Sequence, residues 1–275
     1  MKKDKIIKSS LSTLLKRFSK TDIISSLSNE RTSSTSFLLP LEKIKDNSIL
    51  KPARINEKLL EKRTQMMKES TNSFPLYVIS KNDEYEVVFP RVYYKAAKRL
   101  KLQTVPCYLL DLSEDGALLF LASTLLQDRD TSIIEMSLIF NKIKSKLHYS
   151  QKEIASAMGL SRSQVTNIMR LIDMPKPILD DVADGKLSFG HVRAISTLSE
   201  LEMFNVVNDI YEQRLSVHDV ELLVYSIKHH DHVFKKTKEV EKKYSCTVKG
   251  SPKKLSISFS SVEEKEKFIN QLLKQ

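Results

Sequence analysis

The sequence predicts an α+β protein that is mostly helical and is built from three folded parts. Glycine is scarce, with 5 in 275 residues, which favours helices over a glycine-rich β architecture. Residues 37–112 alternate strand-like and helix-like patterns, whereas apolar residues in 113–228 recur at the three- and four-residue steps of helices. Residues 243–275 have the pattern of a small ββα unit. We therefore expect a small α/β domain, a central all-helical domain and a C-terminal ββα unit.

The first folded part, 37–112, contains short runs that are rich in β-branched and aromatic residues. These runs are Leu76–Ile79, Tyr85–Val88 and Thr104–Leu110. The residues Lys81-Asn82-Asp83 are a predicted turn between the first two runs. Helices are expected over Leu59–Glu69 and Arg91–Leu100, which completes an α/β domain.

The second part, 113–228, has helical periodicity throughout. One apolar stripe steps by three and four residues along a single predicted helix, and its members are Ile133, Met136, Phe140, Ile143 and Leu147. Helix starts carry the Ser-x-x-Glu/Gln pattern, in which a serine oxygen and the longer side chain cap the helix reciprocally. The pairs are Ser150/Glu153, Ser161/Gln164 and Ser199/Glu202.

The N-terminal segment and the linker are basic. Residues 1–36 carry eight basic and three acidic residues and several serine and threonine runs, which predicts a flexible basic arm. Leu11, Leu14, Leu15 and Phe18 fall at helical spacing inside this arm, a stripe suited to folding on a partner.

A basic linker is expected over 229–242, and it serves either as a solvated spacer or as a non-specific contact with nucleic acid. The ββα unit at 243–275 is too small to bury enough surface alone, so we expect it to pair with a second copy.

Charge and composition narrow the class of protein. Lys and Arg number 45 against 34 Asp and Glu, a net charge of +11 that favours association with polyanions. The sequence has no apolar run long enough to span a membrane, so we expect a cytoplasmic chain without membrane contact. The two cysteines, Cys107 and Cys246, have no metal-ligand spacing, and the histidines at 229, 230 and 232 are interpreted as a solvated run. No metal site is therefore expected.

The segment 150–172 has the residue types of a helix-turn-helix. Ala155 is small where two helices must cross closely, Gly159 suits a left-handed turn, and Ser161 caps the second helix. Apolar residues supply the inner faces of both helices, and they are Ile154, Met158, Leu160, Val165, Ile168, Met169 and Ile172.

The outer face of the second helix carries polar side chains suited to DNA. Arginine can fork onto guanine, asparagine can bind adenine, and serine or threonine can hold a phosphate or a base edge. The candidate DNA-binding residues are Ser161, Arg162, Ser163, Gln164, Thr166, Asn167 and Arg170. Gln164 lies near the helix start and either closes the cap or contacts DNA. The alternative for the whole segment is a helical hairpin with a solvated polar face.

Beyond this motif, the chain resembles the ParB family of partition proteins. Gly185-Lys-Leu-Ser-Phe-Gly-His-Val-Arg193-Ala is similar to the family's G-x-L-S-x-G-H-A-R-A segment, and Leu215–Leu223 is similar to its L-x-V-R-x-x-E-x-L helix. The resemblance implies a homodimer that binds an inverted-repeat, centromere-like DNA site. It adds His191 and Arg193 to the candidate DNA-binding residues, with a packed or capping histidine as the alternative for His191.

The resemblance also implies two further ligands. The leucine stripe of 11–18 is similar to the peptide by which relatives bind a ParA-type ATPase. Relatives bind CTP through the motifs G-E-R-R-x-R-A-A and E-N-x-Q-R, where this chain has Pro90–Lys95 and Thr124–Asp128. Most of the charged residues of both motifs are replaced. The remnant pocket residues are Arg91, Lys95, Gln127 and Arg129. We therefore expect no cofactor, and weak or absent turnover of CTP with Mg²⁺.

The sequence thus predicts a site-specific DNA-binding protein of chromosome or plasmid partition, associated with the nucleoid and working with a ParA-type ATPase. A ParB-derived nucleoid-occlusion factor or transcription regulator is the close alternative. An enzyme, either a CTP-hydrolysing clamp, a nuclease or a sulfiredoxin-like protein, is the alternative of another class. Sulfiredoxin chemistry needs an exposed reactive cysteine, whereas Cys107 lies in an apolar strand pattern.

Overall fold

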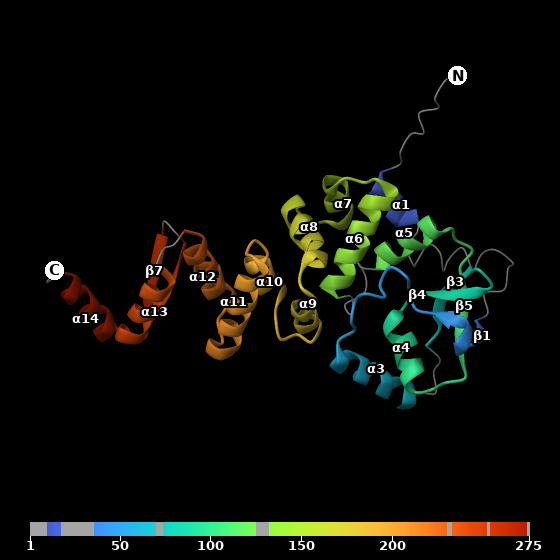
Figure 1. The fold of residues 1–275 in the computed structure, drawn as a ribbon, viewed down its shortest axis with the longest axis horizontal. Coiled ribbons are helices and arrows are strands. Elements are labelled where there is room, and N and C mark those ends of the chain that lie inside the picture. Colours follow the sequence, from blue (N-terminus) through green and yellow to red (C-terminus); the bar gives the residue numbers. More distant parts are fainter. Residues whose placement is uncertain are drawn as a thin grey trace, which may run out of the picture. The chain divides into compact units, whose positions relative to one another are not determined.

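The computed structural model describes residues 10–17, 36–69, 74–124, 132–229, 233–251 and 254–273. The fold is α+β and mostly helical, and it forms two compact units, Met1–Lys186 and Leu187–Gln275 (Figure 1). The boundary expected at residue 112 remains a prediction. The helices that follow the sheet pack against it and share its unit, while the expected helical domain of 113–228 is divided after Lys186.

A five-stranded mixed sheet forms the base of the first unit. Its strands are β1 (Phe37–Pro40), β2 (Ile44–Lys45), β3 (Leu76–Lys81), β4 (Glu84–Phe89) and β5 (Thr104–Leu109), in the order β1-β5-β3-β4-β2. Between β3 and β4, Asn82 and Asp83 adopt φ values of 50° and 61°, which confirms the predicted turn. A short 3-10 turn, η1 (Leu41–Lys43), separates β1 from β2.

Helices cover both faces of this sheet (Figure 1). On one face lie α3 (Glu57–Glu69) and α4 (Arg91–Arg99), and Tyr94 and Ala97 of α4 join the buried core of the strands. On the other face lies α5 (Glu114–Thr124), whose Phe120 ring is 5.7 Å from the ring of Tyr77 on β3. All residues of α5 from Gly116 onward are buried, so this helix needs apolar cover on every side.

The remaining helices of the first unit build a helical layer. They are α6 (Ile133–Leu147), α7 (Gln151–Met158), α8 (Arg162–Met169), the 3-10 turn η2 (Arg170–Asp173) and α9 (Lys176–Ala183). The predicted stripe is confirmed at its centre, where Phe140 and Ile143 of α6 are fully buried, while Ile133, Met136 and Leu147 are partly buried. α6 packs against α5, α8 and η2, and therefore joins the sheet layer to the helices that follow it.

Residues 10–17 correct the expectation of a flexible arm. They form the helix α1 (Leu11–Arg17), which packs against α5 and α7 with Leu11 and Leu15 only 2% and 3% exposed. The physical reason is the leucine stripe itself, which is buried inside the chain's own fold instead of lying open in solvent. The rest of the expected arm, including Phe18, lies outside the described residues.

In its described residues, the second unit has four helices followed by a ββα end. The helices are α10 (Phe189–Ile195), α11 (Glu200–Gln213), α12 (Val217–His229) and α13 (Val233–Tyr244). The antiparallel strands β6 (Cys246–Ser251) and β7 (Lys254–Phe259) follow, and α14 (Val262–Leu272) comes last.

The linker expected at 229–242 is wrong for residues 233 onward. α13 packs against α12 and β6, with Thr237 buried while Lys242 and Lys243 remain exposed. A lysine-rich segment is a helix here because its other side has a neighbour to pack on. Among the described helices, none is long and apolar enough to cross a membrane.

Candidate functional site

Helices α7 and α8 form the predicted helix-turn-helix. Gly159 ends α7 with φ of +66°, a left-handed conformation that glycine adopts at little cost. An added Cβ at Gly159 would meet no atom within 4 Å, so the backbone conformation alone accounts for the glycine. Ile154 and Ala155 of α7 are buried, as are Val165 and Ile168 of α8. The inner faces predicted for these two helices are therefore confirmed.

The prediction for Ile172 is wrong. Its side chain is 40% exposed, whereas Met169 is buried. Ile172 lies in the 3-10 turn η2, which has about three residues per turn instead of 3.6. The chain therefore leaves the α-helical register of α8 before Ile172, and this side chain turns out of the core.

The start of α8 is held by a complete capping box. The backbone N–H of Gln164 donates to Ser161 Oγ at 3.1 Å, and the backbone N–H of Ser161 donates to Gln164 Oε1 at 2.8 Å. Ser150 and Glu153 close the start of α7 in the same way. Two roles were expected for Gln164, and in the structure its side chain closes the helix cap. Both helix starts are thus fixed before any ligand arrives.

The outer face of α8 is open. Arg162, Ser163 and Arg170 are exposed, and Thr166 and Asn167 are partly buried. Thr166 Oγ1 lies 3.0 Å from Gln151 Oε1 on α7 and 2.9 Å from the carbonyl oxygen of Arg162. These candidate residues therefore share one face of α8. Thr166 also links that face to α7 through its hydrogen bond with Gln151.

A basic hollow lies where α6 ends and where α7 and α8 begin. Its lining residues are Lys144, Ser150, Gln151, Lys152 and Arg162. Within the described parts of the chain, no carboxylate lies within ion-pair distance of its three cations. The positive ends of the helix dipoles of α7 and α8 add to these charges and favour an anion such as a phosphate.

Sequence reasoning missed Lys144, Gln151 and Lys152 as candidate contacts. A signal was present, because Gln151 and Lys152 occupy the first turn of a predicted helix, where an anion is stabilised. Lys144 carried no such signal. It comes from the last turn of α6 and reaches the hollow only through the packing of the three helices.

His191 and Arg193 make contacts within the second unit. The Nδ1 atom of His191 lies 3.3 Å from the backbone nitrogen of Ser188 and 3.2 Å from its Oγ, so the imidazole caps α10. Arg193 forms an ion pair with Glu221 of α12. His191 Nε2 is buried and has no hydrogen-bond partner among the described residues.

Gly190, in the same segment, allows α10 and α12 to pack closely. A Cβ added at Gly190 would lie 2.9 Å from Val217 Cγ2 and 3.0 Å from Val217 Cγ1. Only a residue without a side chain lets α10 approach the start of α12 this closely. The segment 185–194 therefore builds the α10–α12 contact in this structure.

The remnant pocket residues Arg91 and Lys95 lie in a buried ion-pair cluster. Arg91, only 6% exposed, donates from Nε to Asp46 Oδ1 at 2.9 Å and from Nη1 to the carbonyl oxygen of Ala53 at 2.8 Å. Lys95 Nζ lies 2.6 Å from Asp46 Oδ2. Burial alone raises the pKa of Asp46, but the hydrogen bonds from Arg91 and Lys95 outweigh it and lower that pKa below 3.8.

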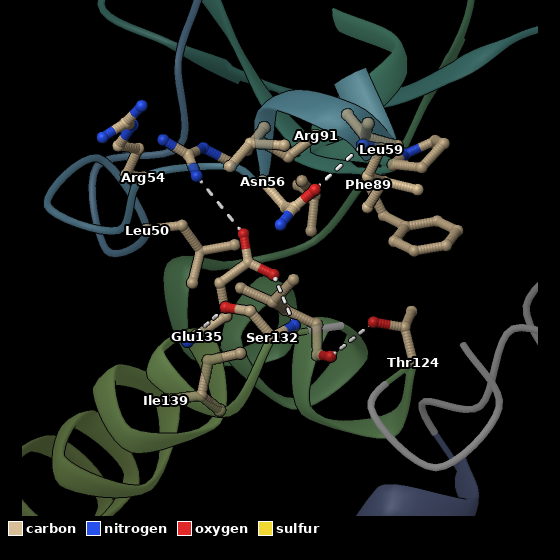
Figure 2. Close-up of a pocket in the computed structure, with 15 residues that line it drawn as sticks. Leu50, Arg54, Asn56, Leu59, Phe89, Arg91, Thr124, Ser132, Glu135 and Ile139 are labelled. Atoms are coloured by element: carbon tan, nitrogen blue, oxygen red, sulfur yellow. Dashed lines mark hydrogen bonds and ion pairs between the residues drawn. The ribbon is translucent and has the colours of Figure 1, made fainter. Parts of the chain in front are cut away.

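Glu135 of α6 completes the cluster. Arg91 Nη1 donates to Glu135 Oε1 at 3.2 Å, and the backbone N–H of Ser132 lies 3.4 Å from Glu135 Oε2. Figure 2 shows Arg91 pointing across the pocket toward Glu135, with Arg54 at the edge. Arg54 is itself paired with Asp184 at 3.3 Å. Gln127 and Arg129, the other remnant residues, lie outside the described residues.

Comparison with known proteins identifies the family. The family model of the ParB HTH domain matches residues 129–229, which contain α6 to α12. The chromosome-partitioning protein Spo0J of Thermus thermophilus is 31% identical over 185 residues, which are 67% of this chain and 68% of the relative. The chain belongs to the ParB family.

Other relatives have similar names. The chromosome-partitioning protein ParB of Myxococcus xanthus is 28% identical over 187 residues, which are 68% of this chain and 63% of the relative. This ParB family member therefore spans less than two thirds of that relative's length. Among solved structures, the C-terminally truncated ParB of Caulobacter crescentus complexed to the centromeric parS site is 27% identical. It covers 70% of this chain and 100% of its own, with a TM-score of 0.41.

The same Caulobacter crescentus protein complexed with CTP-gamma-S is 27% identical and matches with a TM-score of 0.32, covering 64% of this chain and 98% of its own. Among the described residues, the cavity beside Arg91 measures about 70 Å³. Arg91 is already bound to two carboxylates, so its charge is not free for phosphate.

Cys107 of β5 bears on the sulfiredoxin-like alternative. Its side chain is fully buried, and burial raises the pKa of the thiol to about 12. A reactive cysteine requires an accessible thiolate near neutral pH. The buried position of Cys107 therefore does not support the sulfiredoxin-like alternative.

Proposed function

We propose that this ParB family member binds a specific DNA site through α8, as a partition protein. The observation that carries the proposal is the open outer face of α8 beside a basic hollow with no carboxylate at ion-pair distance in the described residues. Arg162 belongs to both features. A surface with free cations and exposed hydrogen-bonding side chains on a capped helix suits the major groove.

The basic hollow and the outer face of α8 have different roles in this proposal. Lys144, Gln151 and Lys152 meet the phosphate backbone, which supplies affinity and orientation but no sequence information. Arg162, Ser163, Asn167 and Arg170 meet base edges or neighbouring phosphates, while Thr166 holds the helix on Gln151. Ser161 and Gln164 support this face through the cap. His191 and Arg193 make their contacts within the second unit, and both are kept as secondary candidates for DNA contact.

We further propose that the protein acts as a homodimer through its ββα end. The exposed apolar residues of α14 and of its C-cap form the candidate surface, and they are Val262, Ile269, Leu272 and Leu273. Val262 and Leu273 are 71% and 79% exposed. A second copy is the partner that lets such a small unit bury its apolar face. A two-fold dimer then requires inverted half-sites in the DNA.

Partition also implies a ParA-type ATPase as partner, and the nucleoid as the place of action. The curated relatives, which are named for chromosome partitioning, support this part of the proposal. A nucleoid-occlusion factor or transcription regulator would use the same DNA chemistry without the ATPase. Stimulation of a cognate ATPase by the purified protein distinguishes the two. Calorimetry with CTP and Mg²⁺ tests the clamp alternative, for which we expect no tight binding.

Selection of binding sites from a random duplex library tests the proposal. The full chain is bound to the library at physiological salt, and bound duplexes are sequenced after several rounds. We expect enrichment of one inverted repeat with half-sites about one helical turn apart. Enrichment of no sequence would mean that the protein binds DNA by charge alone, and it would overturn site-specific recognition.

A further inference from the structure

The leucine face of α1 is part of the core beside the helix-turn-helix. Leu11 and Leu15 are 2% and 3% exposed, whereas Ser10, Thr13 and Lys16 on the other side of the helix are exposed. The Oγ of Ser10 accepts from the backbone N–H of Thr13 at 3.2 Å and caps the helix start. α1 is therefore oriented with one apolar face inward.

The leucine face of α1 packs against two helices, α5 and α7. One is α5, which is buried on every side from Gly116 to Thr124 and takes part of its apolar cover from α1. The other is α7, the first helix of the helix-turn-helix (Figure 1). α7 packs in turn on α8 and accepts the Thr166 hydroxyl through Gln151. A continuous set of contacts thus joins α1 to the candidate DNA-binding face.

We propose that the docking of α1 and DNA binding by α8 are energetically coupled. With α1 docked, α7 is packed on both sides and presents α8 and the basic hollow in one fixed arrangement. When α1 leaves, α7 loses that support, and the arrangement that fits DNA becomes less populated. Leu11 and Leu15 are positioning residues in this account. The inference rests on the proposed DNA binding by α8.

Coupling between two sites is reciprocal, so DNA must also hold α1 in place. A partner with an apolar groove for an amphipathic helix would take the same leucine face. Such a partner cannot hold Leu11 and Leu15 while these side chains are buried against α5 and α7. Capture of α1 therefore weakens DNA binding, and bound DNA weakens capture of α1.

Asparagine substitutions on the two faces of α1 test the coupling. The double variant Leu11→Asn/Leu15→Asn removes the apolar face, and Thr13→Asn places the same residue on the exposed face as a matched control. Leu15→Ala is a milder variant in case the double variant unfolds. Two quantities are measured in the full chain: the affinity for the selected duplex, and the hydrogen exchange of the amides of 151–158.

We expect faster exchange in α7 and an affinity loss of about fivefold or more for the double variant, with a smaller change of the same sign for Leu15→Ala. Thr13→Asn should match the wild type in both measurements. Unchanged exchange in α7 would overturn the supporting role of α1. Faster exchange with unchanged affinity would overturn the coupling.

The outcome for the proposed function is read separately. A wild-type chain that prefers no DNA sequence would refute DNA recognition by α8, whatever α1 does. The exchange of α7 requires no DNA, so it still reports whether α1 supports this helix.

Discussion

Arg91 and Asp46 form a bidentate buried ion pair, with Nε 2.9 Å from Oδ1 and Nη2 3.2 Å from Oδ2. Arg91 begins α4, Asp46 follows β2, and the same guanidinium also reaches Glu135 on α6. The side chain of Arg91 therefore links the sheet layer to the helical layer. Two cations, Arg91 and Lys95, face two carboxylates, so the cluster is neutral as a whole.

Removing the centre of this cluster should destabilise the first unit strongly. We expect Arg91→Ala to lower the free energy of unfolding by about 3–5 kcal/mol, because two largely buried carboxylates lose a shared partner. Arg99→Ala is the control, since it breaks an exposed pair with Glu57 and should cost no more than about 1 kcal/mol. Urea unfolding followed by circular dichroism measures both. Equal effects of the two substitutions would contradict a structural role for the cluster.

Acid should weaken the same cluster through Asp46. Its pKa in the folded protein lies below the ordinary 3.8, so the unfolded chain takes up the proton first as the pH falls. The stabilisation is complete above pH 3.8 and is lost as the pH falls through the lowered pKa. Urea unfolding of Asp46→Asn should therefore differ from the wild type at pH 7 and converge with it only as the pH falls from 3.8 through the lowered pKa.

Asp173→Asn, which removes an exposed carboxylate, is the control for this pH series. A difference between Asp46→Asn and the wild type that stays constant into strong acid would show that ionised Asp46 is not the stabilising form.

Local signals predicted much of the fold. Gly159, the pair Ser161/Gln164 and the turn at Asn82 all lie in short segments whose backbone conformation follows from a few neighbouring residues. The stripe of α6 was equally readable, because a helix buries one face at a fixed period. Fold class and the helix-turn-helix could therefore be stated before any coordinates.

Contacts between distant segments could not be predicted in this way. Arg91 lies 45 residues from Asp46 and 44 from Glu135, and no local pattern marks such a pairing. The leucines of α1 carried a clear helical signal, but the sequence does not say whether the chain itself or a partner covers them. The exposure of Ile172 depended on a change from α-helix to 3-10 turn, which composition does not reveal.

The close contact between α10 and α12 predicts a packing defect at Gly190. Gly190→Ala places a methyl group within 2.9 Å of Val217 Cγ2, and we expect a loss of about 1–3 kcal/mol in the stability of the second unit. Val217→Ala in the same chain should restore part of this loss by making room. A double-mutant cycle of thermal unfolding measures the coupling. Additive effects of the two substitutions would contradict the contact.

The apolar face of α14 predicts how the protein associates. We expect the wild type to sediment as a dimer and the variant Ile269→Glu/Leu272→Glu to sediment as a monomer, because buried charges at the interface are not compensated. Lys267→Glu, also exposed on α14, is the control that changes charge without removing apolar surface. Analytical ultracentrifugation over a range of concentrations measures the state. A wild type that stays monomeric, or a double variant that stays dimeric, would contradict dimerisation through α14.

Sequence-specific recognition by α8 is the central claim, and the affinity of point variants for two duplexes tests it most directly. Fluorescence anisotropy compares Arg162→Ala and Asn167→Ala with the exposed control Asn205→Ala, on the selected duplex and on a scrambled one. Arg162→Ala and Asn167→Ala are each predicted to lose about 1–3 kcal/mol on the selected duplex and little on the scrambled one, with Asn205→Ala unchanged on both. Equal losses on both duplexes would contradict base recognition by α8 and leave only a contact with the phosphate backbone.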